Sequence, residues 1–182
     1  MSDWIGPNTY YIVSRIKDTV FLDLAGGSPA NDTKVQIWDG PGRDNGNSIW
    51  SIVDLGIGDS GKYEYHIINR TSGTHLSTPQ HDLVKKGEGE LLVKTNLVSP
   101  WNNRARWCIV PCRNNTGAYW IVPVLNTKLA LNIQGGGIKN ATPMILYPID
   151  VQPGSENAQF YLRLSDDAIL NCPNIPRAPL QT

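Results

Sequence analysis

Short runs of β-branched, aromatic and other apolar residues recur along the chain, and Gly, Pro, Asn and Asp separate them. No stretch of a dozen residues keeps an apolar stripe at the 3.6-residue spacing of an amphipathic helix. The pattern therefore predicts an all-β protein whose short strands are joined by turns. In the first part of the chain, the expected strands are Tyr10–Ser14, Val20–Leu24, Val35–Trp38 and Ile49–Val53.

Two segments of the sequence, residues 21–38 and residues 130–147, align without a gap, and a weaker third copy lies between them. Four strands in each of three copies make twelve strands, and a fixed internal period of this kind indicates the architecture. The prediction is a β-trefoil, which consists of three pseudo-symmetric four-strand repeats in one domain. The expected boundaries are a domain at 1–166 with repeats at about 9–56, 62–112 and 117–165, and a C-terminal tail at 167–182.

Each repeat also closes with an aromatic residue, which is Trp50, Trp107 or Tyr161. Large aromatic side chains at equivalent positions of a closed, pseudo-symmetric body are expected to meet in its core. The sequence therefore predicts that these three side chains form one core layer around the pseudo-symmetry axis.

Charge and cysteine content narrow the classes of function. The 16 basic and 16 acidic residues give a formal net charge of zero, so the chain offers no field for nucleic acid or anionic lipid. No apolar run approaches the ~18 residues of a membrane span, and the N-terminus lacks a signal pattern, so we expect a cytoplasmic protein. Three cysteines and three histidines without metal-ligand spacing predict neither a disulfide framework nor a metal or other cofactor.

The first repeat places polar and aromatic residues at a regular spacing. Asp23 ends the second expected strand, Gln36 and Trp38 lie on the third, and Asn47 precedes the fourth. This arrangement resembles the ricin-B-type lectin family, whose β-trefoil repeats carry an Asp after the second strand, Gln-x-aromatic on the third and Asn-Gln-x-Trp at the fourth. Ser48 departs from that pattern because it replaces the Gln. The resemblance covers all three repeats and extends to fungal cytosolic lectins.

The chemistry of a sugar explains this choice of residues. Galactose has one face of C–H bonds, which the flat indole of Trp38 can cover at a small cost in side-chain entropy. Neighbouring hydroxyls can both donate to the carboxylate of Asp23, and a hydrogen bond to a charged acceptor contributes about 1.5–3 kcal/mol. Asn47 supplies an amide that donates and accepts. Gln36 lies on the same strand face as Trp38, where it either contacts the sugar or holds Asp23.

Each of these residues also has an ordinary structural explanation, because Asp and Asn commonly support turns. Gly26 and Gly27 permit positive φ and a close approach of other groups to the backbone. Together, at the spacing of the family, the residues predict a carbohydrate site made of Asp23, Gly26, Gly27, Gln36, Trp38 and Asn47.

The third repeat predicts a second, weaker site. Asn132 stands in the position of Asp23, and Tyr147 replaces the tryptophan. A longer loop leaves Ala158 opposite the asparagine of the first repeat, with Asn157 beside it. An amide is a weaker acceptor than a carboxylate, so weaker hydroxyl recognition is expected.

The second repeat is not expected to bind galactose. Ser77 occupies the position of the acidic residue, and Arg104 occupies the position of the asparagine. After the serine, no clear aromatic residue takes the position of Trp38, which is called the platform position because its side chain would stack on the sugar.

An enzyme is not expected. Residues 56–61 formally satisfy a dinucleotide fingerprint, but a strand follows them, so the helix N-terminus that would bind pyrophosphate is missing and a turn between repeats is the expectation.

The resemblance implies a lectin that recognises terminal galactose or N-acetylgalactosamine on glycoproteins or glycolipids, with a defensive, toxic role. One shallow site corresponds to about −4 kcal/mol, so useful binding requires a second sugar or multivalency through a homodimer. Agglutination of cells follows if two sites face outward. The alternative is a β-trefoil protease inhibitor that acts through an exposed loop.

Overall fold

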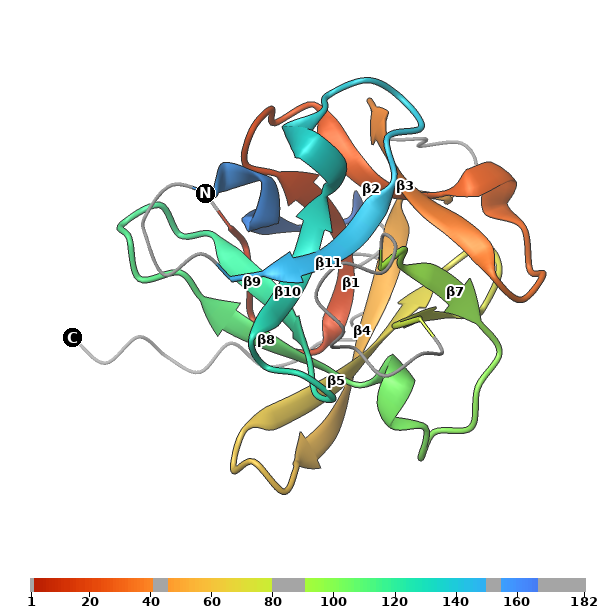
Figure 1. Ribbon diagram of the computed structural model, residues 1–182, viewed down its shortest axis with the longest axis vertical. Coiled ribbons are helices and arrows are strands. Elements are labelled where there is room, and N and C mark those ends of the chain that lie inside the picture. Colours follow the sequence, from red (N-terminus) through yellow and green to blue (C-terminus); the bar gives the residue numbers. More distant parts are fainter. Residues whose placement is uncertain (1, 41–45, 80–90, 150–154, 167–182) are drawn as a thin grey trace.

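The computed structural model describes residues 2–40, 46–79, 91–149 and 155–166. The predicted tail at 167–182 lies outside the described residues. The described residues form twelve strands, four in each predicted repeat, as the pattern of apolar runs predicts (Figure 1). The first repeat contains β1 (Asn8–Ser14), β2 (Val20–Leu24), β3 (Thr33–Asp39) and β4 (Ile49–Ile57). The second contains β5 (Tyr63–Asn69), β6 (His75–Ser77), β7 (Lys94–Asn96) and β8 (Trp107–Pro111). The third contains β9 (Tyr119–Pro123), β10 (Leu129–Ile133), β11 (Met144–Pro148) and β12 (Phe160–Leu164).

The described part of the chain also contains four single-turn 3₁₀ helices, and each follows or precedes a strand. They are η1 (Ala25–Gly27), η2 (Asn103–Ala105), η3 (Gln134–Gly136) and η4 (Glu156–Ala158). None of the described helices has the length and apolarity needed to cross a membrane.

Six strands close into a barrel. The antiparallel order runs β1, β4, β5, β8, β9 and β12, and β12 pairs again with β1 from Tyr10↔Leu164 to Ser14↔Phe160. The other six strands form the hairpins β2–β3, β6–β7 and β10–β11. These hairpins are linked by the pairing of β3 with β7 and by the bridges Gln36↔Pro143 and Leu92↔Ile145. Three repeats of two barrel strands and one hairpin are the β-trefoil that the sequence predicts.

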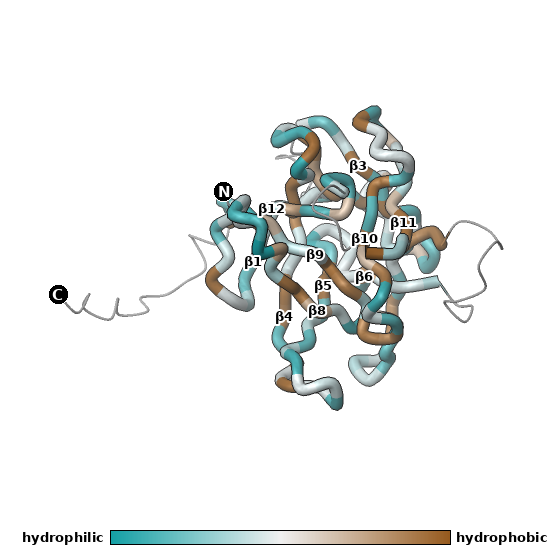
Figure 2. Tube along the Cα trace, turned by 60° about the vertical axis from the view of Figure 1, so that its left-hand side comes forward, coloured by the Kyte–Doolittle hydropathy of each residue, from teal (hydrophilic) through white to brown (hydrophobic). Residues whose placement is uncertain are grey.

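The hydrophobic core lies between the barrel and the hairpins, because it joins side chains of both. Barrel residues such as Ile12 and Ile52 and hairpin residues such as Leu22 and Leu131 are almost fully buried in one cluster. Figure 2 shows apolar stretches along β4, β8 and β9 in the middle of the molecule. Burial of each large apolar side chain contributes about 1.5–3 kcal/mol, which makes this cluster the main source of stability.

The core aromatics follow the prediction in two repeats and differ in the third. Trp50 and Trp107 are fully buried, and each indole N–H donates to a backbone carbonyl, at 2.9 Å in both cases. In the third repeat Phe160 fills the core, whereas Tyr161 is half-buried in a smaller outer cluster. The strand register gives the reason, since Phe160 pairs with the first strand of its repeat at the position where Trp107 pairs in the second. The prediction for Tyr161 was therefore wrong by one residue.

Two further expectations concern single residues or turns. Cys108 and Cys112 are buried free thiols, whereas Cys172 lies outside the described residues. The glycine-rich segment at 56–61 covers the last two residues of β4 and most of the turn to β5, and this hairpin extends below the body of the molecule in Figure 1. It is a turn between the first two repeats, as predicted.

Candidate functional site

The site in the first repeat begins where β2 ends. The chain leaves the strand through η1, in which Gly26 has φ +62° and Gly27 has φ +60°. Residues with a Cβ rarely adopt this left-handed conformation. The two glycines thus allow an abrupt turn directly after Asp23 and Leu24, and both have the positive φ that the sequence analysis expects.

Asp23 is a carboxylate held in a nearly dry environment. Its side chain is only 6% exposed. The amide Nε2 of Gln36 donates to Oδ1 at 3.2 Å, and the hydroxyl of Ser48 donates to Oδ2 at 3.0 Å. Burial raises the pKa of Asp23 above its usual value, although the two hydrogen bonds lower it in part. Each carboxylate oxygen can accept two hydrogen bonds, so Asp23 keeps acceptor capacity for a ligand.

Trp38 provides an exposed aromatic surface on the adjacent strand. It lies two residues after Gln36 on β3, and side chains two apart on a strand share a face. Phe21 pairs with it across β2 and β3. The indole is 41% exposed, in contrast to Trp50 and Trp107 in the core. An exposed indole next to a held carboxylate is an arrangement that can stack on a sugar ring while hydroxyls are bound.

Asn47 approaches the same turn from the other side. A Cβ on Gly27 would overlap Oδ1 of Asn47, so the side chain of Asn47 lies directly against this glycine. The Asn47 carbonyl accepts hydrogen bonds from the backbone of Leu24 at 3.0 Å and from Nδ2 of Asn69 at 2.8 Å. The turn after β2 and the segment before β4 are therefore held together. The structure brings five of the six predicted residues of the first repeat to this end of the β2–β3 hairpin, and Trp38 lies two residues further along β3, opposite Phe21.

Sequence reasoning missed one residue of this group. Ser48 was noted only as a departure from the family pattern, yet its hydroxyl is one of two side-chain donors to Asp23. A small polar residue directly after Asn47 was the available signal. The structure also assigns Gln36 to holding the carboxylate, because it is itself nearly buried and donates to Asp23.

The third repeat repeats this geometry with neutral groups. η3 follows β10, and Gly135 and Gly136 have φ +60° and +65°. Nδ2 of Asn157 donates to Oδ1 of Asn132 at 3.1 Å, and Asn132 is buried. Tyr147, at the platform position, is 56% exposed. Asn132 and Asn157 are thus in contact, and Tyr147 lies on the neighbouring strand opposite Ala130.

Asn157, and not Ala158, is the counterpart of Asn47. Asn157 stands three residues before the core residue Phe160, as Asn47 stands three before Trp50. The alignment of the longer loop was one residue out of register, and the candidate Asn157 itself lies within the group.

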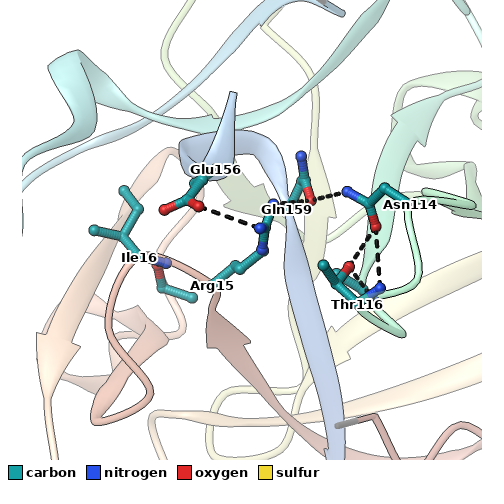
Figure 3. Close-up of polar contacts among 8 residues, drawn as sticks. Arg15, Ile16, Asn114, Thr116, Glu156 and Gln159 are labelled. Carbon is teal, nitrogen blue, oxygen red and sulfur yellow. Dashed lines mark hydrogen bonds and ion pairs between the residues drawn. The ribbon is translucent and has the colours of Figure 1, made fainter. Parts of the chain in front are cut away.

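The turn that carries Asn157 is braced by the first repeat (Figure 3). Arg15, just after β1, donates to Oε1 of Gln159 at 2.7 Å and forms an ion pair with Glu156 at 3.2 Å. Nδ2 of Asn114 donates to the same Gln159 oxygen at 3.0 Å. Figure 3 shows Arg15 between Glu156 and Gln159, with Asn114 on the far side of Gln159. Residues from two other segments of the chain therefore fix the position of η4.

The second repeat has a different arrangement at the equivalent place. Arg104 donates through Nε and Nη2 to the carbonyl of Thr78, at 3.1 and 2.8 Å. Ser77 is buried and donates to the carbonyl of His75 at 2.9 Å. Both side chains therefore donate to backbone carbonyls of this turn. Lys94 pairs with Ser77, so Asn96, two residues later, stands at the position that Trp38 has in the first repeat. Among its described residues, the repeat has no carboxylate at the position of Asp23 and no aromatic side chain at the position of Trp38, in agreement with the sequence.

No group of three or more His, Cys, Asp or Glu side chains that could hold a metal ion occurs within the described ranges.

Comparisons with known proteins agree with this architecture. Residues 46–147, more than half of the chain, match the family described as "Ricin-type beta-trefoil lectin domain-like". No curated protein matches the sequence. The structure is similar to that of the Rhizoctonia solani agglutinin, with 19% identity, a TM-score of 0.71 and coverage of 91% of this chain and 100% of that chain.

Two further solved structures are similar. The Macrolepiota procera ricin B-like lectin, in complex with lactose, has 16% identity and a TM-score of 0.64, with coverage of 90% of this chain and 100% of that chain. The C-half of the earthworm R-type lectin, in complex with GalNAc, has 19% identity and a TM-score of 0.59, with coverage of 86% and 98%. At these identities the likeness establishes the shared fold.

Proposed function

Because this chain belongs to the ricin-type β-trefoil lectin family, we propose that it is a carbohydrate-binding protein without catalytic activity that recognises terminal galactose or N-acetylgalactosamine through its first repeat. The observation that carries the proposal is the nearly buried carboxylate of Asp23, held by two donors beside the exposed indole of Trp38. Desolvation of a carboxylate opposes folding, so its retention here is best explained by a ligand that needs a charged acceptor.

Each group has a defined task in this proposal. Trp38 covers the C–H face of the sugar, and Asp23 accepts from two neighbouring hydroxyls. Gln36 and Ser48 orient the carboxylate and do not contact the sugar. Asn47, pressed against Gly27, adds an amide at the edge of the site. The sugar complexes of the two similar lectins, one with lactose and one with GalNAc, support this choice of substrate.

The third repeat is the second, weaker site of this proposal. Asn132 and Asn157 recognise hydroxyls through amides, and Tyr147 takes the place of the indole. Neutral hydrogen bonds contribute about half as much as charge-assisted ones. Two sites on one chain let a monomer cross-link glycans, so agglutination does not require a homodimer.

The other functions considered from the sequence have less support. A protease inhibitor that acts through an exposed loop has no use for a buried carboxylate beside an exposed indole, and membership of a lectin family does not favour it. The lectin proposal and the inhibitor alternative therefore differ in what loss of Trp38 would do.

A glycan array tests the proposal with four proteins, namely the wild type, Trp38→Ala, the double variant Trp38→Ala/Tyr147→Ala and the control Trp101→Ala. Trp101 is an 83% exposed indole in the second repeat, so the control removes a matched side chain away from the site. We expect wild type and Trp101→Ala to bind galactose- and N-acetylgalactosamine-terminated glycans, with competition by free galactose. Trp38→Ala should keep only weak binding, which Tyr147→Ala then removes. An array without wild-type signal, or full binding by Trp38→Ala, would overturn the proposal.

A further inference from the structure

A turn of the third repeat holds the backbone beside Trp38. This turn, residues 139–142, is called the clamp turn here and lies between η3 and β11 (Figure 1). Its Ala141 N–H donates to the carbonyl of Ile37 at 3.0 Å, and the Ile37 N–H donates to the carbonyl of Thr142 at 3.0 Å. The residue before Trp38 is thus fixed to another repeat through both of its backbone polar groups.

The residue after Trp38 is fixed by the same turn through a side chain. Oδ1 of Asn140 accepts a hydrogen bond from the backbone N–H of Asp39 at 2.7 Å. The Asp39 carboxylate in turn accepts from Lys17 and from Thr19, each at 2.7 Å. Both neighbours of Trp38 therefore have fixed positions, and a half-exposed indole takes its direction mainly from its backbone.

The molecule contains a matched copy of this contact at a place without a platform. Asn31, the counterpart of Asn140 in the first repeat, accepts from the backbone N–H of Leu97 in the second repeat at 2.8 Å. Leu97 follows Asn96, which stands where Trp38 stands in the first repeat. The same type of bond thus occurs next to an aromatic platform in one case and next to an asparagine in the other.

We propose that Asn140 is a positioning residue for the sugar site of the first repeat. It contacts no sugar, and through Asp39 it sets the direction in which Trp38 presents its ring. The effect on sugar affinity rests on the proposed function, whereas the effect on the indole does not. Stacking of Trp38 on a sugar depends on the orientation of its ring. The binding residues of this site belong to the first repeat, and Asn140 of the third repeat sets the orientation that they need.

The test compares Asn140→Ala with Asn140→Asp and with Asn31→Ala. Each protein carries 5-fluorotryptophan, and the fluorine resonance of Trp38 is identified by its loss in Trp38→Phe. Asn140→Ala should shift or broaden this resonance without ligand and should weaken galactose binding by at most about fivefold, because the energy of one hydrogen bond is the upper limit on what reorienting Trp38 costs. Asn140→Asp keeps the acceptor oxygen and should retain both wild-type properties.

Asn31→Ala is the matched control, since it removes the equivalent bond to Leu97. It should leave the Trp38 resonance and the affinity for galactose unchanged. If Asn140→Ala does not fold, Thr142→Val replaces it, because the Thr142 hydroxyl closes the clamp turn by donating to the carbonyl of Lys139 at 2.7 Å. Thr142→Val should affect Trp38 in the same direction.

The outcomes separate the two proposals. An unchanged Trp38 resonance in Asn140→Ala would overturn the positioning role, whether or not the protein binds galactose. A changed resonance in a protein whose wild type binds no glycan would confirm that Asn140 orients Trp38 and would refute the proposed function. Equal loss of affinity in Asn140→Ala and Asn31→Ala would show a general structural effect and would also overturn the proposal.

Discussion

Asp23→Asn should lower affinity for galactose without lowering the stability of the fold. The substitution keeps the size and shape of the side chain and removes its charge. A hydrogen bond to a charged acceptor contributes about 1 kcal/mol more than one to a neutral acceptor, and two hydroxyls give about 2 kcal/mol. This difference corresponds to an affinity about 30-fold lower. Isothermal titration with galactose measures it.

The stability of Asp23→Asn follows from the pKa of the carboxyl group. Burial raises this pKa, so the folded state binds the proton more tightly than the unfolded state, and the ionised form opposes folding at neutral pH. Asparagine has no charge to desolvate. Its amide can still accept from Gln36 and donate to Ser48, which now accepts. The free energy of unfolding at pH 7 should therefore equal or exceed that of the wild type.

A denaturant titration at pH 7 completes the test of Asp23→Asn. The reasoning is refuted if the variant binds galactose as tightly as the wild type. It is also refuted if affinity and unfolding free energy fall together, because the carboxylate would then serve the fold. A free energy of unfolding that is unchanged or higher, together with a lower affinity for galactose, would show that Asp23 serves binding and not stability.

Two further predictions concern a close contact and a buried histidine. Gly27→Ala should lower the free energy of unfolding by more than about 2 kcal/mol and weaken galactose binding, because the added Cβ would overlap Asn47. In the control Gly26→Ala the added Cβ meets no atom, so the loss should be only about 1 kcal/mol, which is the cost of positive φ. Equal losses for the two variants in denaturant titrations would contradict this reasoning. Burial and the neighbouring His75 lower the pKa of His66 to about 4, so stability should be complete above pH 6.5 and fall by up to about 3 kcal/mol toward pH 4. Unfolding measured across this range should lose that dependence in His66→Gln, and an unchanged profile would count against it.

The internal repeat was the part of the fold that the sequence predicted best. The gapless register places Thr33 opposite Thr142, and in the structure each hydroxyl donates to the carbonyl three residues earlier, at 2.6 and 2.7 Å. Asn31 and Asn140 likewise make equivalent bonds. Hydrogen bonds between residues close in sequence can be predicted from each copy alone. The bonding of both asparagines to the next repeat depends on how the hairpins meet, which no single copy contains.

The wrong predictions concern residues whose position depends on the length of a loop or on contacts between distant segments. The third connection is longer, and the turn Glu156–Ala158 sets the phase of the strand that follows. A shift of one residue moves every side chain to the other face of a strand, so Phe160 enters the core instead of Tyr161. The role of Ser48 was missed for a related reason, since its bond to Asp23 joins segments 25 residues apart.

The pairing of β12 with β1 has a consequence for the synthesis of the protein. Among the described strands, a ribosome releases β1 first and β12 last. Until then the nascent barrel has one side open, where β1 and β9 both lack the partner that β12 supplies. Unpaired strand edges are templates for association between chains. Chaperone demand should therefore persist until β12 has left the ribosome, and a message truncated before residue 160 should yield an aggregating product.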